Sequence, residues 1–325
     1  MNDPVLKPRE ESIAEHASSP RVVAILLATY NGEKFLVEQL ESLLAQTHRN
    51  WVIYASDDGS SDATLEILHL YQKRLGKDRL FILSGPCQGF SKNFMSLVKS
   101  SLVKEEYVAF CDQDDVWLPK KLENGLAFLS GVAVETPALY CSRTHLIDEK
   151  GASIGFSPLF RRPPNFENAL VQSIAGANTM LLNKAALELL RLTDDRTAII
   201  SHDWWAYILV TGCSGKVFFD AEPSVLYRQH GSNLIGSNSS ASDRLVRVRE
   251  MLKGTFKYWN DSNLDAIKAA AISLSDSCGN TISCFEEARR SSLFPGIYLL
   301  LKSGVYRQTM IGNIGLFVAF IIKKV

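Results

Sequence analysis

Glycine-rich phosphate-binding loops are missing from this sequence. The first long apolar run, 22–28, is followed by Thr29-Tyr30-Asn31-Gly32-Glu33 and not by a G-x-G-x-x-G turn, and the chain contains no Walker loop. These absences exclude the usual dinucleotide-binding fingerprint and the P-loop of nucleotide hydrolases. Any phosphate group that binds here must therefore be neutralised by other means.

Net charge, cysteine pairs and a signal peptide are missing too. The 325 residues carry 35 Lys and Arg against 35 Asp and Glu, and 46% of them are hydrophobic, as in a folded globular protein. The six cysteines have no C-x-x-C spacing, so we expect reduced core residues in a cytoplasmic protein. Residues 1–20 lack the apolar core of a signal peptide, and we expect them to form a flexible leader.

The C-terminal part lacks an apolar run long enough to cross a bilayer. After a low-complexity linker, residues 237–325 are expected to form a basic helical region, with about twelve Lys and Arg against about six Asp and Glu from Arg244 onward. One helix is expected at about 263–290. The terminal run 310–322 is shorter than the ~20 residues that span a membrane. We expect it to be a packed or interfacial helix, with a membrane surface, a second subunit or solvent on its outer face.

Apolar runs alternate with helical patterns along the first two thirds of the chain. This alternation predicts an α/β fold with a doubly wound, mostly parallel sheet in residues 21–236. Strands are expected at 22–28, 51–55, 80–83, 107–111, 138–142, 177–182, 216–220 and 224–230.

Acidic residues gather directly after the strand at 107–111. The segment Asp112-Gln113-Asp114-Asp115 places three carboxylates within four positions. In an open α/β sheet the carboxyl ends of the strands form the ligand-binding edge, and clustered oxygen ligands there suit Mg²⁺ or Mn²⁺. The alternative is an acidic turn in which Asp114 or Asp115 starts the next helix.

Polar residues also follow the second and third strands. Asp57-Asp58-Gly59 comes after the strand at 51–55, although the same residues are typical of a plain turn. Lys92 and Asn93 lie near the start of a helix after the third strand, where they either contact a phosphate or belong to an ordinary capped helix. Because parallel strands end at one edge of the sheet, we expect these groups to converge.

A further carboxylate lies in the second half of the chain. Ser201-His202-Asp203 starts a predicted helix, and Asp203 suits either the positive first turn of that helix or a catalytic role. The last predicted strand carries Tyr227-Arg228-Gln229-His230. A histidine in this position is either a metal ligand or a hydrogen-bonded structural residue.

These motifs, in this order, resemble glycosyltransferase family 2 over about residues 21–236. The resemblance rests on Thr29-Tyr30-Asn31-Gly32, Asp57-Asp58-Gly59, Asp112-Gln113-Asp114-Asp115, His202-Asp203 and Tyr227-Arg228-Gln229-His230. It implies a GT-A fold and an inverting, metal-dependent glycosyltransferase. The residues at 112–117 (Asp-Gln-Asp-Asp-Val-Trp) and at 227–233 (Tyr-Arg-Gln-His-Gly-Ser-Asn) are most similar to the rhamnosyltransferase-like branch of bacterial polysaccharide assembly.

The resemblance also implies residue roles. Asp203 is expected to be the general base, in a family motif that often reads Glu-Asp. Asp114 and His230 are expected to bind Mn²⁺ or Mg²⁺, and Asp58 is expected to bind the pyrimidine. The remaining residues expected to bind the nucleotide-sugar are Thr29, Tyr30, Asn31, Glu33, Asp57, Lys92, Asn93, Asp112, Gln113 and Arg228.

The expected partners follow from the same resemblance. They are a dTDP- or UDP-sugar, with rhamnose among the candidate sugars, and a saccharide or lipid-linked acceptor of O-antigen or capsule assembly. We expect no nucleic-acid partner and a cytoplasmic location, with peripheral membrane contact or a homo-oligomer contact through 244–325. Two alternatives stay open: a nucleotidyltransferase, which would need a Gly- and Lys/Arg-rich loop after the first strand, and a non-catalytic nucleotide-sugar-binding protein.

Overall fold

Four parallel strands form the first half of the sheet. The computed structural model describes residues 21–231, 249, 252–270 and 272–325, and within them nine strands pair in the order β3-β2-β1-β4-β8-β6-β9-β5, with β7 beside β6. The four parallel strands match the predicted runs to within two residues at either end. They are β1 (Val23–Thr29), β2 (Trp51–Asp57), β3 (Leu80–Ser84) and β4 (Tyr107–Cys111).

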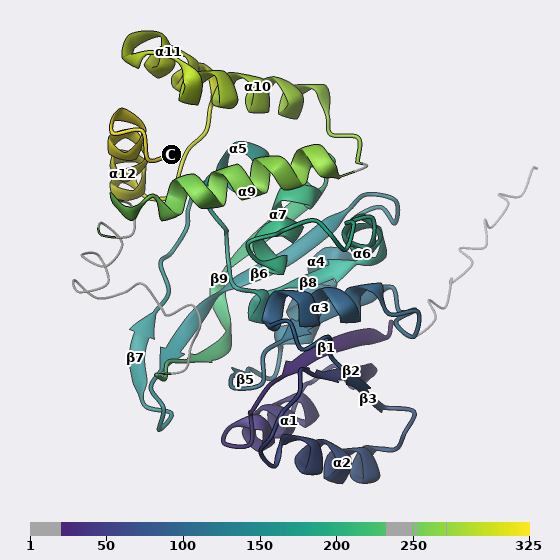
Figure 1. Cartoon of the computed structure of the whole chain (residues 1–325). Coiled ribbons are helices and arrows are strands. Elements are labelled where there is room, and N and C mark those ends of the chain that lie inside the picture. Colours follow the sequence, from purple (N-terminus) through teal and green to yellow (C-terminus); the bar gives the residue numbers. More distant parts are fainter. Residues whose placement is uncertain (1–20, 232–248, 250–251, 271) are drawn as a thin grey trace, which may run out of the picture.

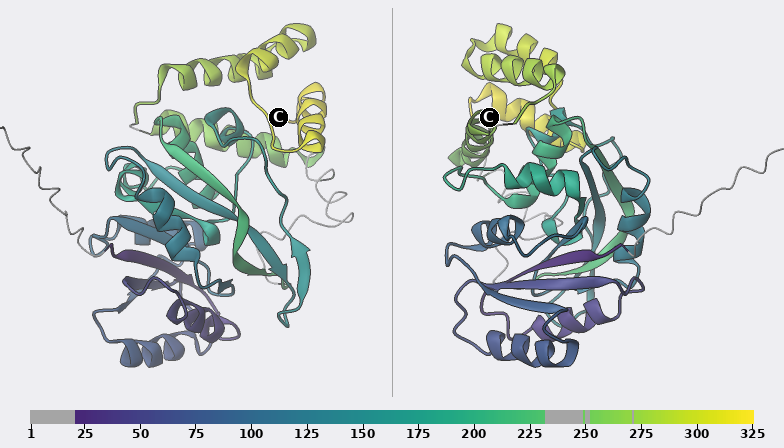
Figure 2. Two further views of the ribbon diagram at one scale, coloured as in Figure 1. Left: turned by 180° about the vertical axis from the view of Figure 1, so that it is seen from behind. Right: turned by 90° about the vertical axis from the view of Figure 1, so that its right-hand side faces the viewer.

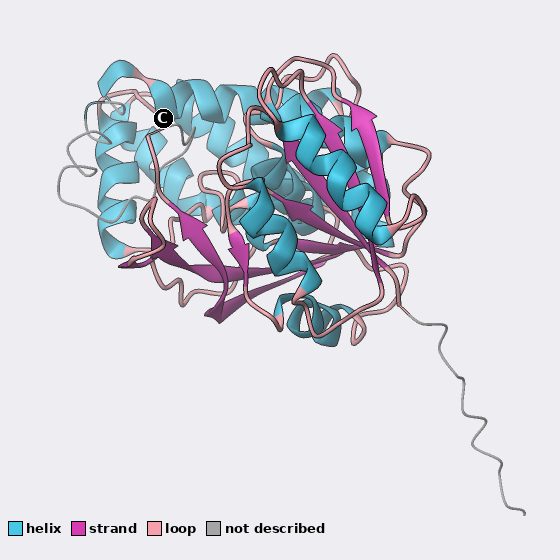
Figure 3. Cartoon of the chain, turned by 90° about the horizontal axis from the view of Figure 1, so that it is seen from below, coloured by secondary structure: helices cyan, strands magenta, loops and turns pink. Residues whose placement is uncertain are grey.

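Helices cover both faces of these strands, as Figures 1 and 3 show. In β1, Val23, Ile25 and Leu27 belong to one buried cluster and Ala24 and Leu26 to the other, because successive side chains of a strand point to opposite faces. The first cluster contains apolar residues of α1 (Leu36–Leu44), α2 (Thr64–Leu75) and α4 (Lys121–Leu129). The second contains those of α3 (Phe90–Lys99), α6 (Lys184–Arg191) and α7 (His202–Gly212).

The second half of the sheet is mixed. Strand β8 (Leu181–Asn183) is antiparallel to β4 and to β6 (Ala138–Ile147), and β6 runs parallel to β9 (Lys216–Arg228). The short strand β5 (Val116–Trp117) is antiparallel to β9, and β7 (Ser153–Phe156) is antiparallel to β6.

Two expected strand boundaries are wrong in this half. The segment predicted as a strand at 177–182 begins with a 3-10 turn, η1 (Ala177–Thr179), in which the Thr179 hydroxyl donates to the carbonyl of Gly176. The two closing strands are one strand, β9, whose register on β6 shifts between Asp220 and Val225. Pro223 lies in that shift. Proline has no N–H to donate to a neighbouring strand, so it is tolerated at such an irregularity.

The C-terminal helices stack at one end of the molecule, beyond α5 (Phe166–Ala169) and α7 and away from α1 and α2 (Figures 1 and 2). They are α9 (Thr255–Ala269), α10 (Asp276–Arg290), α11 (Leu293–Ser303) and α12 (Met310–Ile321). The single helix expected at 263–290 is therefore wrong. The segment before α10 is held against the end of α7, where Ser275 donates its N–H to the carbonyl of Gly212.

Three further expectations concern the leader and linker, membrane-spanning helices and the cysteines. The predicted leader and the predicted linker lie outside the described residues. No helix in the described ranges is both long and apolar enough to cross a bilayer. All six cysteines are free, but only three of them are buried, namely Cys111, Cys141 and Cys278; Cys87 is exposed, which contradicts the expectation of a core residue.

Candidate functional site

The ends of β1, β2 and β4 bring the predicted motifs to one edge of the sheet. Thr29, the last residue of β1, is in register with Asp57 of β2, and Leu27 is in register with Cys111 at the end of β4. The acidic segment follows Cys111 directly. The predicted convergence of these strand ends therefore holds in the structure.

Three carboxylates from two distant segments lie near one another at this edge. Burial raises the pKa of Asp112 to about 8, and the nearby charges of Asp114 and Asp203 add to that shift. The positive charge of the buried Lys121 lowers the pKa of Asp112. Negative charge thus exceeds positive charge here, a situation that a bound cation would relieve.

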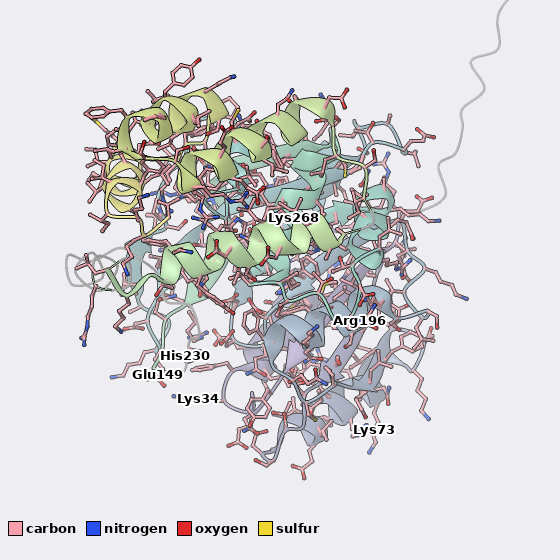
Figure 4. The ribbon with its side chains drawn as sticks, turned by 45° about the horizontal axis from the view of Figure 1, so that its top comes forward. Lys34, Lys73, Glu149, Arg196, His230 and Lys268 are labelled. Atoms are coloured by element: carbon pink, nitrogen blue, oxygen red, sulfur yellow. The ribbon has the colours of Figure 1, made fainter. Side chains whose placement is uncertain are left out.

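His230 lies against the second aspartate of the acidic segment. Its Nε2 is 2.8 Å from Oδ2 of Asp114, and its ring lies 5.1 Å from the ring of Phe35, centroid to centroid. Strand β9 ends at Arg228 and so delivers His230 to the carboxyl end of β4. Figure 4 shows His230 close to Glu149 and Lys34, which form an ion pair with each other.

The residues present fit a divalent cation. A carboxylate and an imidazole facing one another are a donor pair that suits Mn²⁺, and carboxylates also suit Mg²⁺. Among the described residues no group of three or more acidic, histidine or cysteine side chains is arranged to hold a metal. The remaining ligands would therefore come from substrate phosphates and water, as is usual for Mg²⁺ sites.

Asp115 is fully buried and positions the acidic segment. Its Oδ2 accepts a hydrogen bond from Nδ2 of Asn178 at 2.5 Å, and its Oδ1 accepts from the backbone N–H of Arg228 at 3.1 Å. Burial, with the charges of Asp114 and Asp112, holds the pKa of Asp115 well above its usual range. The alternative that Asp114 or Asp115 starts the next helix is wrong, since α4 begins at Lys121.

Arg228 lies beneath the site, so the expectation of direct contact with a diphosphate needs correction. Its side chain is 2% exposed. Its Nε donates to the carbonyl of Asp114 at 3.0 Å, and its other nitrogens bind Oε2 of Glu38 at 2.5 Å and the carbonyl of Glu149 at 3.2 Å. Arg228 therefore ties the acidic segment to α1 and to the turn between β6 and β7.

Gln113 fastens the loop after β1. Its Oε1 accepts the backbone N–H of Tyr30 at 2.8 Å, and its Nε2 donates to the carbonyl of the same residue at 2.9 Å. Gly32 permits this approach, because a Cβ there would lie 2.3 Å from Oε1 of Gln113. The Tyr30 side chain is left 59% exposed beside the acidic segment, and Asn31 is also exposed.

Asp57 and Asp58 have different surroundings. Oδ1 of Asp57 accepts from the Thr29 hydroxyl at 2.9 Å, and its Oδ2 accepts the N–H of Ser60 at 2.9 Å, so Asp57 fixes the turn. Gly59 completes the turn with a φ of +92°, a conformation that favours glycine. Asp58 accepts N–H groups from the loop after β3, at Cys87 and Gly89. Thr29, Asp57 and Asp58 are all buried.

Three predicted ligand residues are used elsewhere. Oε2 of Glu33 accepts the N–H of Ala63 just before α2, so Glu33 stabilises the start of that helix. Lys92 donates to the carbonyl of Asp195 at 2.6 Å, in the loop after α6. Asn93 is 1% exposed and donates to the carbonyl of Ser56. For Asn93 the burial contradicts the expected direct ligand contact.

Asp203 is held at the start of α7 by hydrogen bonds from three sides. It accepts from the Ser201 hydroxyl and from the backbone N–H groups of Ala177 and Trp204, the last at 2.7 Å. Burial nevertheless raises the pKa of Asp203 above its usual value. A carboxylate that is aligned and more basic than usual is suited to accept a proton.

The neighbouring His202 has a structural role. It is 2% exposed, stacks on Phe94 with ring centroids 4.1 Å apart, and meets the edge of Phe110 at 4.8 Å. Neither ring nitrogen has a hydrogen-bond partner in the described part of the chain. Burial lowers the pKa of His202 to about 3, which keeps the ring neutral.

Asn178 and Lys121 are two further buried residues of the site. Through η1, the N–H of Ala177 binds Asp203 while Nδ2 of Asn178 binds Asp115, so one turn positions both acidic groups. Lys121 is 1% exposed, with its Nζ 4.0 Å from the ring centroid of Trp117. A lysine at the start of a helix is typically solvated, and no local pattern indicates its burial here.

Comparison with known proteins now identifies the family. Residues 24–188 match the model of glycosyl transferase family 2. The chain belongs to this family. It is therefore an inverting glycosyltransferase, and the nucleotidyltransferase alternative is wrong.

The relatives of this family 2 chain include enzymes of bacterial glycan assembly. It is 28% identical over 237 residues to the dTDP-rhamnosyl transferase RfbG of Shigella flexneri, covering 68% of this chain and 78% of RfbG. It is 28% identical over 170 residues to WfaP of Escherichia coli, a UDP-Glc:alpha-D-GlcNAc-diphosphoundecaprenol beta-1,3-glucosyltransferase, covering 51% of this chain and 62% of WfaP. The similarity to RfbG supports the rhamnosyltransferase-like branch.

The GT-A fold is confirmed by a solved structure. The family 2 chain superposes on TarS 1–349 of S. aureus in complex with UDP-GlcNAc with a TM-score of 0.54 and 15% identity, covering 86% of this chain and 79% of that one.

Proposed function

We propose that this glycosyltransferase uses a divalent cation and a dTDP- or UDP-sugar, and that Asp203 removes the proton from the acceptor hydroxyl. The observation that carries the proposal is the approach of Asp203 and His230, from α7 and from the end of β9, to the acidic segment after β4. The names of RfbG and WfaP support dTDP-rhamnose and UDP-glucose as the first donors to test.

Each group of the site has a separate task in this proposal. Tyr30 and Asn31 hold the nucleotide, Asp58 accepts from the pyrimidine, and Asp112 accepts from the ribose. Asp114 and His230 would hold Mn²⁺ or Mg²⁺, which when bound offsets the charge that develops on the departing nucleoside diphosphate. Asp203 takes the proton of the acceptor hydroxyl as the acceptor oxygen attacks the anomeric carbon. The nucleoside diphosphate leaves in the same step, and this single displacement inverts the anomeric configuration.

The acceptor proposed for this site is a saccharide or lipid-linked saccharide of surface polysaccharide assembly, used on the cytoplasmic side of a membrane. WfaP is named for a diphosphoundecaprenol-linked acceptor, which supports the lipid-linked class. Such an acceptor requires the enzyme to work at a membrane surface, and the C-terminal helices are the elements that would meet it.

Donor binding is tested first, by thermal shift with dTDP-rhamnose, UDP-glucose and UDP-GlcNAc in the presence of Mn²⁺. A ligand at 100 times its dissociation constant should stabilise the protein by about 2.7 kcal/mol. Transfer is then measured with synthetic mono- and disaccharide diphosphoprenyl acceptors, and the product anomer is read by NMR.

The two readouts separate the possible outcomes. Binding with metal followed by transfer with inversion supports the proposal. Binding of a nucleotide-sugar at full strength in EDTA contradicts the metal role. Tight binding without turnover on any acceptor of either class contradicts the proposed acceptor.

A further inference from the structure

The outer faces of α11 and α12 carry an unusual density of exposed apolar side chains. Phe294 is 84% exposed, Leu301 70% and Met310 81%. We define the α11–α12 surface by eight exposed apolar side chains, which are Phe294, Tyr298, Leu301, Met310, Ile311, Ile314, Val318 and Ile321. Their spacing of three or four residues places those of each helix on one helical face.

Helix α12 is apolar on every side. Residues 310–321 contain no charged side chain, and the side-chain amide of Asn313 donates back to the carbonyls of Arg307 and Thr309. Leu316, Ala319 and Phe320 are buried against the rest of the chain, while the opposite face is exposed. A helix that is hydrophobic all round is normally covered on both faces. At 12 residues it is too short to span a bilayer, which leaves a surface contact.

The charged side chains that follow Glu287 have one sign, although acidic side chains of α9 and α10 lie beside Leu293 and Ile321 and one of them, Asp261, pairs with Arg289. The sequence has no Asp or Glu after Glu287, whereas it has six cationic residues there: Arg289, Arg290, Lys302, Arg307, Lys323 and Lys324. Lys302 and Lys323 are exposed. A second copy docking through the same surface would bring like charges together, which is unfavourable. An anionic surface with an apolar interior is complementary in both respects.

Helix α12 has a clear place relative to the sheet. Figures 1 and 2 show α12 on the same side of the molecule as β7. Helix α12 packs against α11, since a Cβ on Gly296 would lie 2.9 Å from the ring of Phe320. The two helices therefore form one continuous element.

We propose that the α11–α12 surface docks on a bilayer that contains anionic lipids, with its apolar side chains in the interface and its cations among the headgroups. Docking itself does not depend on the proposed reaction. It adds to that reaction by holding the enzyme at the membrane that carries a lipid-linked acceptor.

Vesicle flotation with the full-length protein tests the docking. We expect the wild type to float with phosphatidylcholine vesicles that contain 30% phosphatidylglycerol in about 50 mM salt. Binding should fall at least tenfold with pure phosphatidylcholine, and it should also fall in about 500 mM salt because screening weakens the headgroup contacts. These arms need no variant and so do not depend on folding of a mutant.

Two double variants test whether the α11–α12 surface is the part of the protein that binds the vesicle. Phe294→Gln with Leu301→Gln should lower the partition coefficient at least tenfold, and Lys302→Gln with Lys323→Gln should lower it several-fold. The matched control is Leu70→Gln with Lys73→Gln on α2, where Leu70 is 64% exposed and Lys73 lies far from α12 (Figures 1 and 4). The control should float like the wild type, and all variants should keep wild-type turnover on a soluble acceptor.

Three results would overturn the proposal: no flotation of the wild type with anionic vesicles, equal flotation with neutral vesicles, or unchanged flotation of the Phe294/Leu301 variant. If sedimentation instead shows a dimer that the same variant dissociates, the surface is a contact between copies of this chain. Because turnover is measured on a soluble acceptor, failure of docking is distinguishable from failure of the proposed reaction.

Discussion

Nε2 of His230 lies 2.8 Å from Oδ2 of Asp114, across 116 residues of sequence. The two side chains come from β9 and from the segment after β4, and the buried Arg228 fixes the geometry by donating to the carbonyl of Asp114. Asp114 and His230 are the residues that would hold a divalent cation.

Asp114→Asn should abolish Mn²⁺-dependent donor binding and leave the fold intact. A neutral amide is a poorer ligand than a carboxylate and cannot balance the cation's charge. Isothermal titration of the donor with Mn²⁺, and again with EDTA, should give two similar weak affinities for the variant and two different ones for the wild type. Asp78→Asn, at an exposed turn, is the control and should behave like the wild type. Unchanged affinity in Asp114→Asn would remove Asp114 from the metal site.

Asp203→Asn should reduce transfer by ~10²–10⁴-fold while donor and metal affinity stay near wild type. The amide cannot take the acceptor's proton, although its oxygen can still accept one of the N–H groups that hold Asp203. If Asp203 only stabilises the first turn of α7, the substitution should cost about 1 kcal/mol of stability and leave turnover intact. Single-turnover rates and a melting curve on the same variant decide between the two.

Gln113→Met should weaken donor binding on the order of tenfold without a comparable change in kcat. The variant keeps the length of the side chain but loses both hydrogen bonds to the backbone of Tyr30, each typically worth about 0.5–1.5 kcal/mol. The loop after β1 would then have to be ordered by the nucleotide itself. The measurement is the donor dissociation constant beside kcat. A fall in kcat with unchanged affinity would show that Gln113 acts in the transfer step and not on the loop.

His202→Phe should make stability less sensitive to acid. In the wild type the unfolded chain binds a proton near the ordinary pKa of 6.5, whereas the folded ring, with its pKa lowered to about 3, does not. Stability is therefore present above pH 6.5 and is lost as the pH falls. Relative to the variant, the wild type should lose roughly 2 kcal/mol between pH 7 and pH 5.

Urea unfolding of both proteins at several pH values checks this prediction. Any overpacking by the larger ring lowers the variant's stability equally at each pH, so only the pH dependence is informative. If the free energy of unfolding changes with pH equally in the two proteins, the folded His202 ring takes up a proton as readily as the unfolded one, and its pKa is not lowered.

The sequence by itself determined the first half of the sheet and the place of the site. The runs that form β1 to β4 are local patterns of apolar residues, and the carboxyl ends of parallel strands share one edge whatever the rest of the chain does. For this reason the convergence of the acidic segment with the Asp57-Asp58 turn was predictable, whereas the approach of Asp203 and His230 was implied only by the resemblance to glycosyltransferase family 2.

Tertiary structure alone decided which polar side chains face a ligand and which lie beneath it. Arg228, Asn93 and Lys121 are buried because residues distant in sequence cover them, and no local pattern contains that information. The same holds for α12, whose sequence is apolar on every face. Only the packing of Leu316 and Phe320 against the rest of the chain shows which face is covered and which is left for a partner.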